Sequence, residues 1–195
     1  MKQLAKRVLV LHSSNDMYGA SRIVLQVIDI LIKAKYEVHV ILPYKGVLNK
    51  IITDKGASCS TRNLGVFRKK YLNLKGLYNR FLKIKKAKNH ISNYIDKHHI
   101  DLLYTSTSVI ISGALAAKKS SIPNISHIHE IPTANKSYEI FIGLFVRYFS
   151  KKVIVVSNSV AKHWQAYLKK NQLLKVYNGI IFPLLKTPDT TKKKI

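Results

Sequence analysis

The chain has 195 residues, of which 34 are Lys or Arg and 9 are Asp or Glu, so its formal net charge is +25. A hydrophobic content of 47% excludes intrinsic disorder, and eight Gly with five Pro exclude a collagen-like or linker-like chain. Cys59 is the only cysteine, which excludes a disulfide framework and a zinc site of four thiolates. These values predict one compact, strongly basic domain.

Short apolar runs alternate with helical spacings in the first third of the chain. Residues 7–12 (RVLVLH) predict a buried strand, because their apolar run is shorter than the roughly 7–15 residues that a signal peptide needs. The pattern then predicts a helix over 19–34, a strand over 37–42, a helix over 47–55 that Gly56 ends, and a strand over 57–61. No apolar stretch approaches the roughly 20 residues that span a bilayer. We therefore expect a cytoplasmic protein that meets a membrane only at its surface.

Residues 62–99 differ in composition, with eleven basic residues and the single acid Asp96. Apolar residues keep a helical spacing here, and we expect its aromatic residues, including Tyr78 and Phe81, to face the core. The alternation then resumes. It predicts strands over 101–105, 124–129, 152–157 and 173–177, and helices over 109–119, 137–150 and 158–169. Residues 182–195 indicate a loose, polar and basic tail.

Strands that alternate with helices predict βαβ units and a mostly parallel sheet. Right-handed crossovers make this a single α/β domain, doubly wound and Rossmann-like. Ligands of such sheets bind outside the carboxyl ends of the strands. The residues that follow each predicted strand are therefore the candidates for a functional site.

The loop after the first strand is small and polar and opens a helix. Such a loop suits an anion, because free backbone N–H groups face the ligand and Gly19 permits close approach. The loop has a single glycine, so the dinucleotide fingerprint G-x-G-x-x-G is absent. The alternative is structural, with Asp16 or Ser13 capping the helix.

Two later strand ends also carry polar groups. Hydroxyl side chains at 105–108 suit a sugar or a phosphate, or cap the next helix. Alternation places His127 and His129 on the same side, with Glu130 at the rim. Imidazole suits proton transfer or polarisation of a leaving phosphate, and we favour such a catalytic role. One alternative is a metal site, for which the sequence shows no third ligand. The other alternative is structural, with the histidines packed in a loop. Ser157 suits a helix cap, and 178–179 (NG) a turn.

Together these segments resemble family 4 glycosyltransferases of the GT-B fold. The resemblance spans residues 7–181 and rests on five pieces in the family's order. These are the loop 15–22 (NDMYGASR), 101–107 (DLLYTST), 121–130 (SIPNISHIHE), 153–157 (VIVVS) and 176–180 (VYNGI). The resemblance implies that residues 1–181 are the N-terminal, acceptor-side domain of a retaining transferase that uses a nucleotide sugar.

The resemblance also implies roles for individual residues. The glycine loop, Asn15, Asp16, Tyr18 and Gly19, maps beside the donor diphosphate and the acceptor. His129 maps near the transferred sugar with Glu130 next to it, as the catalytic pair. We place the strand-end residues Thr105, Ser106 and His127 near the acceptor, and Ser157, Asn178 and Gly179 on the side of the donor and the interdomain hinge.

The sequence departs from the family in two ways. The family loop often has two glycines followed by an acid, whereas this loop has Gly19-Ala20-Ser21. The family's second Rossmann domain, with its diphosphate-binding Arg and Lys and its glutamate pair, is also missing from the sequence. We therefore expect the chain alone to have little or no transferase activity, and we expect it to need no metal or other cofactor.

The basic stretch suggests where the enzyme works. Many enzymes of this family act on lipid-linked acceptors at anionic membranes, and each nearby Lys or Arg contributes about 1 kcal/mol there. We expect a lipid-linked or glycan acceptor and a membrane-facing surface formed by Arg68, Lys69, Lys70, Arg80, Lys83, Lys85, Lys86 and Lys88. Nucleic acid is a poor fit, because no recognition motif accompanies the charge. The alternative function is a non-catalytic basic module that binds anionic lipid or nucleic acid.

Overall fold

The computed structural model describes residues 6–132 and 135–179, so the predicted tail 182–195 lies outside the described residues. One sheet of seven strands runs in the order β3-β2-β1-β4-β5-β6-β7, and every neighbouring pair is parallel. The strands are β1 (Arg7–Leu11), β2 (Glu37–Leu42), β3 (Ser58–Thr61), β4 (Leu102–Thr105), β5 (Asn124–Ile128), β6 (Lys152–Val155) and β7 (Leu173–Lys175). The predicted doubly wound, parallel α/β domain is confirmed.

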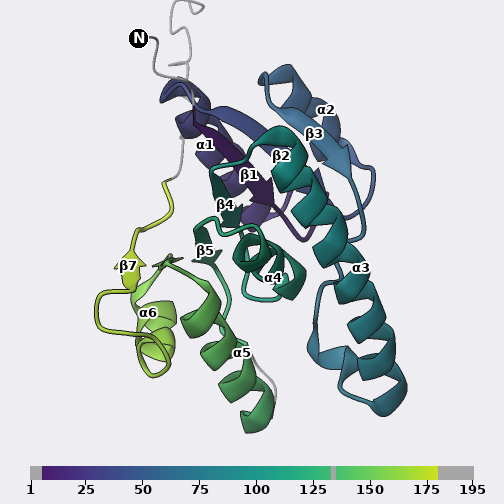
Figure 1. The fold of residues 1–195 in the computed structure, drawn as a ribbon. Coiled ribbons are helices and arrows are strands. Elements are labelled where there is room, and N and C mark those ends of the chain that lie inside the picture. The colour runs from purple at the N-terminus through teal and green to yellow at the C-terminus, as the bar shows by residue number, and fades with distance from the viewer. Residues whose placement is uncertain (1–5, 133–134, 180–195) are drawn as a thin grey trace, which may run out of the picture.

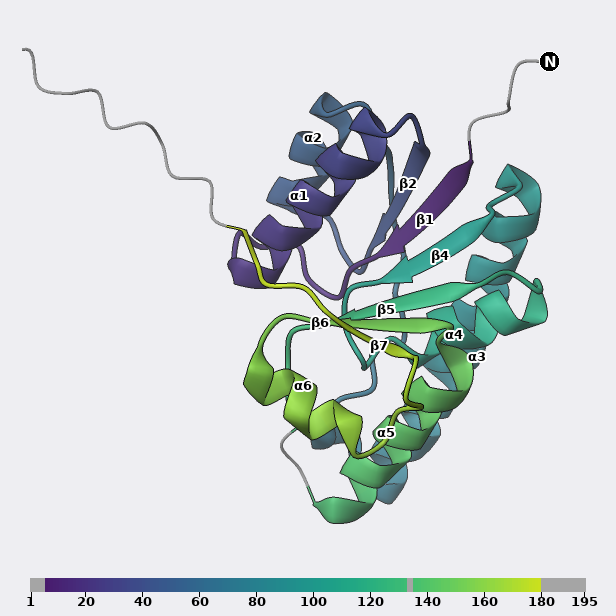
Figure 2. The same cartoon turned by 90° about the vertical axis from the view of Figure 1, so that its left-hand side faces the viewer.

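Helices cover both faces of the sheet (Figures 1 and 2). They are α1 (Gly19–Lys33), α2 (Val47–Asp54), α3 (Leu74–His98), α4 (Ile111–Lys119), α5 (Lys136–Phe149) and α6 (Asn158–Gln165), with a 3₁₀ turn η1 (Lys69–Tyr71). The helices α1 and α2 share one apolar cluster with β1 and β2, and α3 and α4 share a second cluster on the other face. The helices α5 and α6 form a third cluster with β6 around the fully buried Trp164.

Most predicted boundaries agree with the structure to within two residues. Gly56 follows the end of α2 with a φ of +91°, which confirms its role as the stop of that helix. The largest error at the end of an element is in α6, which ends at Gln165 rather than at residue 169.

The long helix α3 departs most from expectation. Its second half packs on the sheet, where Ile91 and Ile95 are buried. Its first half extends beyond the sheet (Figure 1), and there Tyr78 is 68% and Phe81 64% exposed. The prediction that these aromatic residues face the core is therefore wrong, because η1 and the segment before the helix pack against another side of its first turns, where Arg80 is buried.

The order of the strands defines a switch point between β1 and β4. Chain connections run one way from β1 to β2 and β3, and the other way from β4 to β7. At such a point the loops diverge and leave a crevice at the carboxyl edge of the sheet, where α/β proteins bind ligands. The predicted candidates from β1, β4 and β5 all lie at this edge.

Candidate active site at the carboxyl edge of the sheet

His12 joins the two strands of the switch point. It follows β1, is 2% exposed, and its Nδ1 lies 2.6 Å from the hydroxyl of Ser106, which follows β4. Its Nε2 lies 2.9 Å from the hydroxyl of Ser21 in the first turn of α1. Burial lowers the pKa of His12 to about 4, so the ring is neutral at pH 7. Sequence reasoning treated His12 as the end of a strand and missed this role, although its position at a carboxyl strand end was a signal.

The loop after β1 leaves the start of α1 open. The N-cap residue is Tyr18, no side chain caps the helix, and its first turn holds no acid. The predicted capping by Asp16 or Ser13 is therefore wrong. A Cβ built on Gly19 meets nothing within 4 Å, so the space in front of the helix is free within the described residues. Unpaired N–H groups at a helix start favour an anion.

Asp16 and Asn15 shape this loop in different ways. Asp16 accepts hydrogen bonds from the hydroxyl of Ser14 and, at 3.5 Å, from the backbone N–H of Tyr18. The bond from Ser14 is the main cause that lowers the pKa of Asp16. Asn15 is 4% exposed, and its amide donates to the carbonyl of Tyr44 at 2.6 Å and accepts from the N–H of Leu48 at 2.8 Å. Asn15 therefore positions the loop, because both groups of its amide bond within the chain.

His127 and His129 lie together at the end of β5, as alternation predicted. Their ring centroids are 4.3 Å apart. The hydroxyl of Tyr104 is hydrogen-bonded to His127 Nδ1, while the Nε2 atoms of both histidines are buried and have no partner among the described residues. Burial lowers the pKa of His127 to about 3 and also lowers that of His129. Two neutral imidazoles thus present unused nitrogens at the site.

Glu130 ties this strand end to the loop after β4. One carboxylate oxygen accepts from the Thr107 hydroxyl at 2.6 Å and from the N–H and hydroxyl of Ser108, both at 2.8 Å. The hydroxyls at 105–108 do not cap α4, whose N-cap residue is Ile110. Thr105 is 2% exposed and donates to Asn124 at 3.0 Å, so its hydroxyl is used within the chain, and its predicted place near an acceptor stays a prediction.

A cavity of about 330 Å³ opens beside Glu130. Ser13, Thr107 and Ser108 line one part of it, and Arg68 and Lys69 line another. Two of the residues assigned to a membrane-facing surface therefore face this cavity.

The remaining basic residues divide by exposure. The side chains of Lys70, Lys83, Lys85 and Lys86 are exposed, and Lys88 is half-buried. Arg80 is only 8% exposed and stacks on the ring of Tyr71, with its guanidinium carbon 3.9 Å from the ring centroid. The assignment of Arg80 to a membrane-facing surface is wrong, because a buried charge does not reach a lipid headgroup.

The predicted donor-side residues lie further along the sheet. The hydroxyl of Ser157 accepts from the N–H of Val160 at 3.2 Å, which confirms the helix cap at α6. Asn178 and Gly179 are exposed, and the carbonyl of Gly179 accepts from the Gln26 amide at 3.1 Å. Figure 2 shows the segment after β7 running across to α1, so these residues approach the candidate site from the far end of the sheet.

Two features are absent from the described residues. No helix in residues 6–132 and 135–179 has the length and hydrophobicity to cross a membrane. No group of three or more His, Cys, Asp or Glu residues in those ranges is arranged to hold a metal ion.

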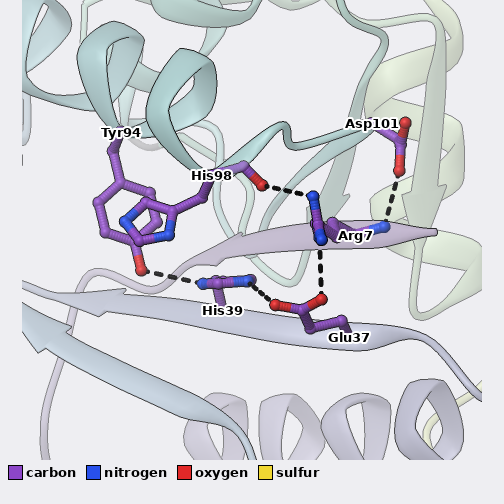
Figure 3. Close-up of polar contacts among 6 residues, drawn as sticks. All are labelled: Arg7, Glu37, His39, Tyr94, His98 and Asp101. Atoms are coloured by element: carbon purple, nitrogen blue, oxygen red, sulfur yellow. Dashed lines mark hydrogen bonds and ion pairs between the residues drawn. The ribbon is translucent and has the colours of Figure 1, made fainter. Parts of the chain in front are cut away.

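A second polar cluster lies at the opposite, amino edge of the sheet (Figure 3). His39 is 4% exposed, and its ring nitrogens lie 3.0 Å from the Tyr94 hydroxyl and 3.0 Å from Glu37. Glu37 also pairs with Arg7 at 2.8 Å, and the backbone N–H of Arg7 donates to Asp101 at 2.8 Å. Both ring nitrogens of His39 therefore have a partner within the chain.

The doubly wound sheet of seven parallel strands matches one half of GT-B glycosyltransferases. The sequence profile of Glycosyltransferase Family 4 matches residues 17–181, and the chain belongs to this family. The predicted resemblance is thereby confirmed. A search of curated proteins found no match.

Solved structures show the same fold. Anabaena Alr3699/HepE, crystallised with UDP and glucose, is 18% identical, with a TM-score of 0.65 over 89% of this chain and 44% of its own. A glycosyltransferase from Rickettsia africae is 20% identical, with a TM-score of 0.67 over 91% of this chain and 44% of its own. The lipopolysaccharide outer core galactosyltransferase WaaB is 13% identical, with a TM-score of 0.62 over 97% of this chain and 50% of its own. The chain thus spans about half the length of the structures it matches.

Proposed function

We propose that the chain is the acceptor-binding half of a retaining glycosyltransferase that transfers a sugar from a nucleotide sugar to a lipid-linked or polysaccharide acceptor. The observation that carries the proposal is the pair of unpartnered, neutral histidines beside an uncapped helix start at the switch point. The family match and the UDP and glucose bound to the Anabaena enzyme support a nucleotide sugar as the donor.

In this proposal, the histidines act as neutral hydrogen-bond donors and not as positive charges. Burial raises the pKa of Tyr104, so its hydroxyl keeps its proton. This hydroxyl donates a hydrogen bond to Nδ1 of His127. The ring proton then sits on Nε2, which has no partner among the described residues. His129, whose ring is tilted against that of His127, faces the transferred sugar. Donors placed in advance at a buried site stabilise charge that develops in the transition state.

The departing nucleoside diphosphate would meet the open start of α1. Its negative charge is stabilised there by free N–H groups and by the helix dipole. Glu130 holds the loop after β4 against the end of β5 and thereby fixes the shape of the acceptor side. No step of this scheme uses a metal ion.

We propose that this half acts together with a donor-binding domain. The chain covers 44% of the Anabaena enzyme, and the paired glutamates of the family's donor domain have no counterpart in the sequence. The test measures nucleoside diphosphate released from a panel of nucleotide sugars, by the chain alone and after fusion to the donor-binding half of the Anabaena enzyme. We expect release only from the fusion. Sugar transfer by the chain alone would contradict the proposal.

His129→Ala in the same fusion tests the site. We expect its turnover to fall by about 100-fold, the usual loss when one transition-state hydrogen-bond donor is removed. Turnover close to that of the parent fusion would rule out the proposed role of His129.

We further propose that the first half of α3 docks on an anionic membrane. Leu74 is 87% exposed, Tyr78 68% and Phe81 64%, and they share this half of the helix with Lys75, Lys83 and Lys85. A helix with exposed aromatic and basic residues binds the interface of an anionic bilayer.

Liposome flotation tests this docking. We expect the chain to float with vesicles that contain phosphatidylglycerol and to stay behind with phosphatidylcholine alone. Phe81→Ser should reduce flotation, whereas Ile30→Ser, which changes a 64% exposed residue on α1, should not. Equal flotation with both lipids, or equal loss in both variants, would contradict this surface.

A further inference from the structure

Arg80 is a buried cation without a countercharge. Its side chain is in the second turn of α3 and is 8% exposed. Its Nη2 donates to the side chain of Asn79 at 2.9 Å, but its Nε has no partner among the described residues. No carboxylate of those residues lies within the 4.0 Å of an ion pair with Arg80.

Such an arrangement is costly in a folded protein. A guanidinium removed from water without a carboxylate loses hydration that a single amide bond and one aromatic ring replace only in part. Buried polar atoms nearly always have partners, so an exception needs an explanation. An anion that arrives from outside would supply both the missing charge and the missing hydrogen bond.

The structure offers a place for this anion. Arg80 and Arg68 line the same cavity of about 180 Å³, together with the rings of Tyr44 and Tyr71. This volume is below the roughly 300–1,000 Å³ of pockets that hold drug-sized ligands, so it suits one small charged group rather than a whole lipid. No acidic residue lines it.

This cavity adjoins the candidate active site. The hydroxyl of Tyr44 lies 3.3 Å from the backbone nitrogen of Asn15 and 3.4 Å from the hydroxyl of Ser14, both in the loop before α1. Arg68 lines both this cavity and the larger one that contains Glu130. A molecule that occupies the active site can therefore place one of its groups between the two arginines.

We propose that the Arg68–Arg80 cavity binds an oxyanion of the acceptor, a phosphate or a carboxylate. This inference rests on the proposed transferase function, and it narrows the acceptor to an anionic one. The planar fork of Arg80 pairs with two oxygens of such a group, and Tyr71 holds the guanidinium in place. Arg68, which is exposed and lines the same cavity, supplies a second positive charge to this group.

The test is isothermal titration of the purified 195-residue chain with inorganic phosphate, with glucuronate and with glucose, at constant ionic strength. We expect both anions, or one of them, to bind and glucose not to bind in this cavity. Tighter binding of phosphate would indicate a phosphorylated acceptor, and tighter binding of glucuronate a uronic acid. Because no transfer is measured, the result is independent of whether the chain takes part in catalysis.

Three variants locate the binding. Arg68→Gln changes an exposed side chain and should weaken anion binding about tenfold, the effect of losing one charged hydrogen bond. Arg80→Gln should abolish binding in protein that circular dichroism shows to be folded, and if it does not fold, Arg68→Gln decides. Lys85→Gln removes an equal charge from α3 outside this cavity and should leave affinity within about twofold. Binding of neither anion, or equal weakening by Arg68→Gln and Lys85→Gln, would overturn the proposal.

Discussion

The two edges of the sheet contain the same residue types, but the side chains have different roles. At the amino edge, His39 lies between Tyr94 and Glu37, and both of its ring nitrogens have partners (Figure 3). At the carboxyl edge, His127 also contacts a tyrosine, yet its Nε2 and that of His129 have no partner among the described residues. Buried polar groups without partners are rare because they cost free energy. The difference supports the proposal that the amino edge is structural and that a ligand completes the network at the carboxyl edge.

We expect the largest difference between the two edges in how acid lowers the free energy of unfolding. The pKa of His12 is lowered to about 4 in the folded chain against 6.5 when unfolded. As pH falls from 6.5 to 4, the unfolded chain gains a proton that folded His12 does not, so stability drops by about 3 kcal/mol. His127, with a pKa of about 3, adds a similar loss over the same range and extends it to lower pH. Urea unfolding at pH 7, 5.5 and 4.5 measures it.

His12→Gln is the matched variant, because its side chain does not titrate. Over the same range it should lose about 3 kcal/mol less stability than the parent, because only the contribution of His127 remains. Glu37 at the amino edge has a lowered pKa, mainly through its hydrogen bond with Arg7, so its contribution is lost only below about pH 4.5. Parallel curves for the parent and His12→Gln would contradict the assignment of the neutral ring.

Gly19→Val should block the carboxyl edge without unfolding the chain. A Cβ at Gly19 meets no atom within 4 Å, and valine and glycine differ by less than about 0.5 kcal/mol in helix propensity. We expect turnover of the two-domain fusion to fall about 100-fold, because the added methyl groups displace the bound donor or acceptor. A variant with full activity would show that nothing binds in front of α1.

In contrast to Gly19→Val, His39→Ala should lower the stability of the chain and leave its turnover unchanged. It leaves the Tyr94 hydroxyl and Glu37 without their buried partner, which costs about 2 kcal/mol of unfolding free energy. The fusion should keep its turnover at 20 °C. A loss of turnover without a loss of stability would show that the amino edge contributes to function.

Glu37→Gln should have the smallest effect. The Glu37 side chain is 49% exposed, and ion pairs of this kind contribute less than about 1 kcal/mol. Thermal melting should detect a small decrease and the transfer assay none. A larger loss would mean that the Arg7–Glu37 pair organises the whole amino edge.

Much of the fold could be predicted because strands and helices differ in their apolar period. The strand over Glu37–Leu42 was predicted to the residue, and alternation along β5 placed His127 and His129 together. These features depend on local sequence.

The site was less predictable because its partners are distant in sequence. His12 is held by Ser106, 94 residues away, and Glu130 by Thr107 and Ser108, more than 20 residues away. Arg80 is buried because Tyr71 and the segment before α3 fold over its side chain. The spacing of apolar residues along a helix does not predict such a contact. For the same reason, helical spacing alone did not reveal which side of the first half of α3 is left exposed.

The most direct test of the difference between the edges compares His129→Ala with His39→Ala in one transfer assay. Both variants are made in the two-domain fusion and assayed where both remain folded. We predict that His129→Ala lowers kcat about 100-fold, whereas His39→Ala stays within about twofold of the parent. Equal losses in the two variants, or a larger loss for His39→Ala, would contradict the assignment of the carboxyl edge as the active site.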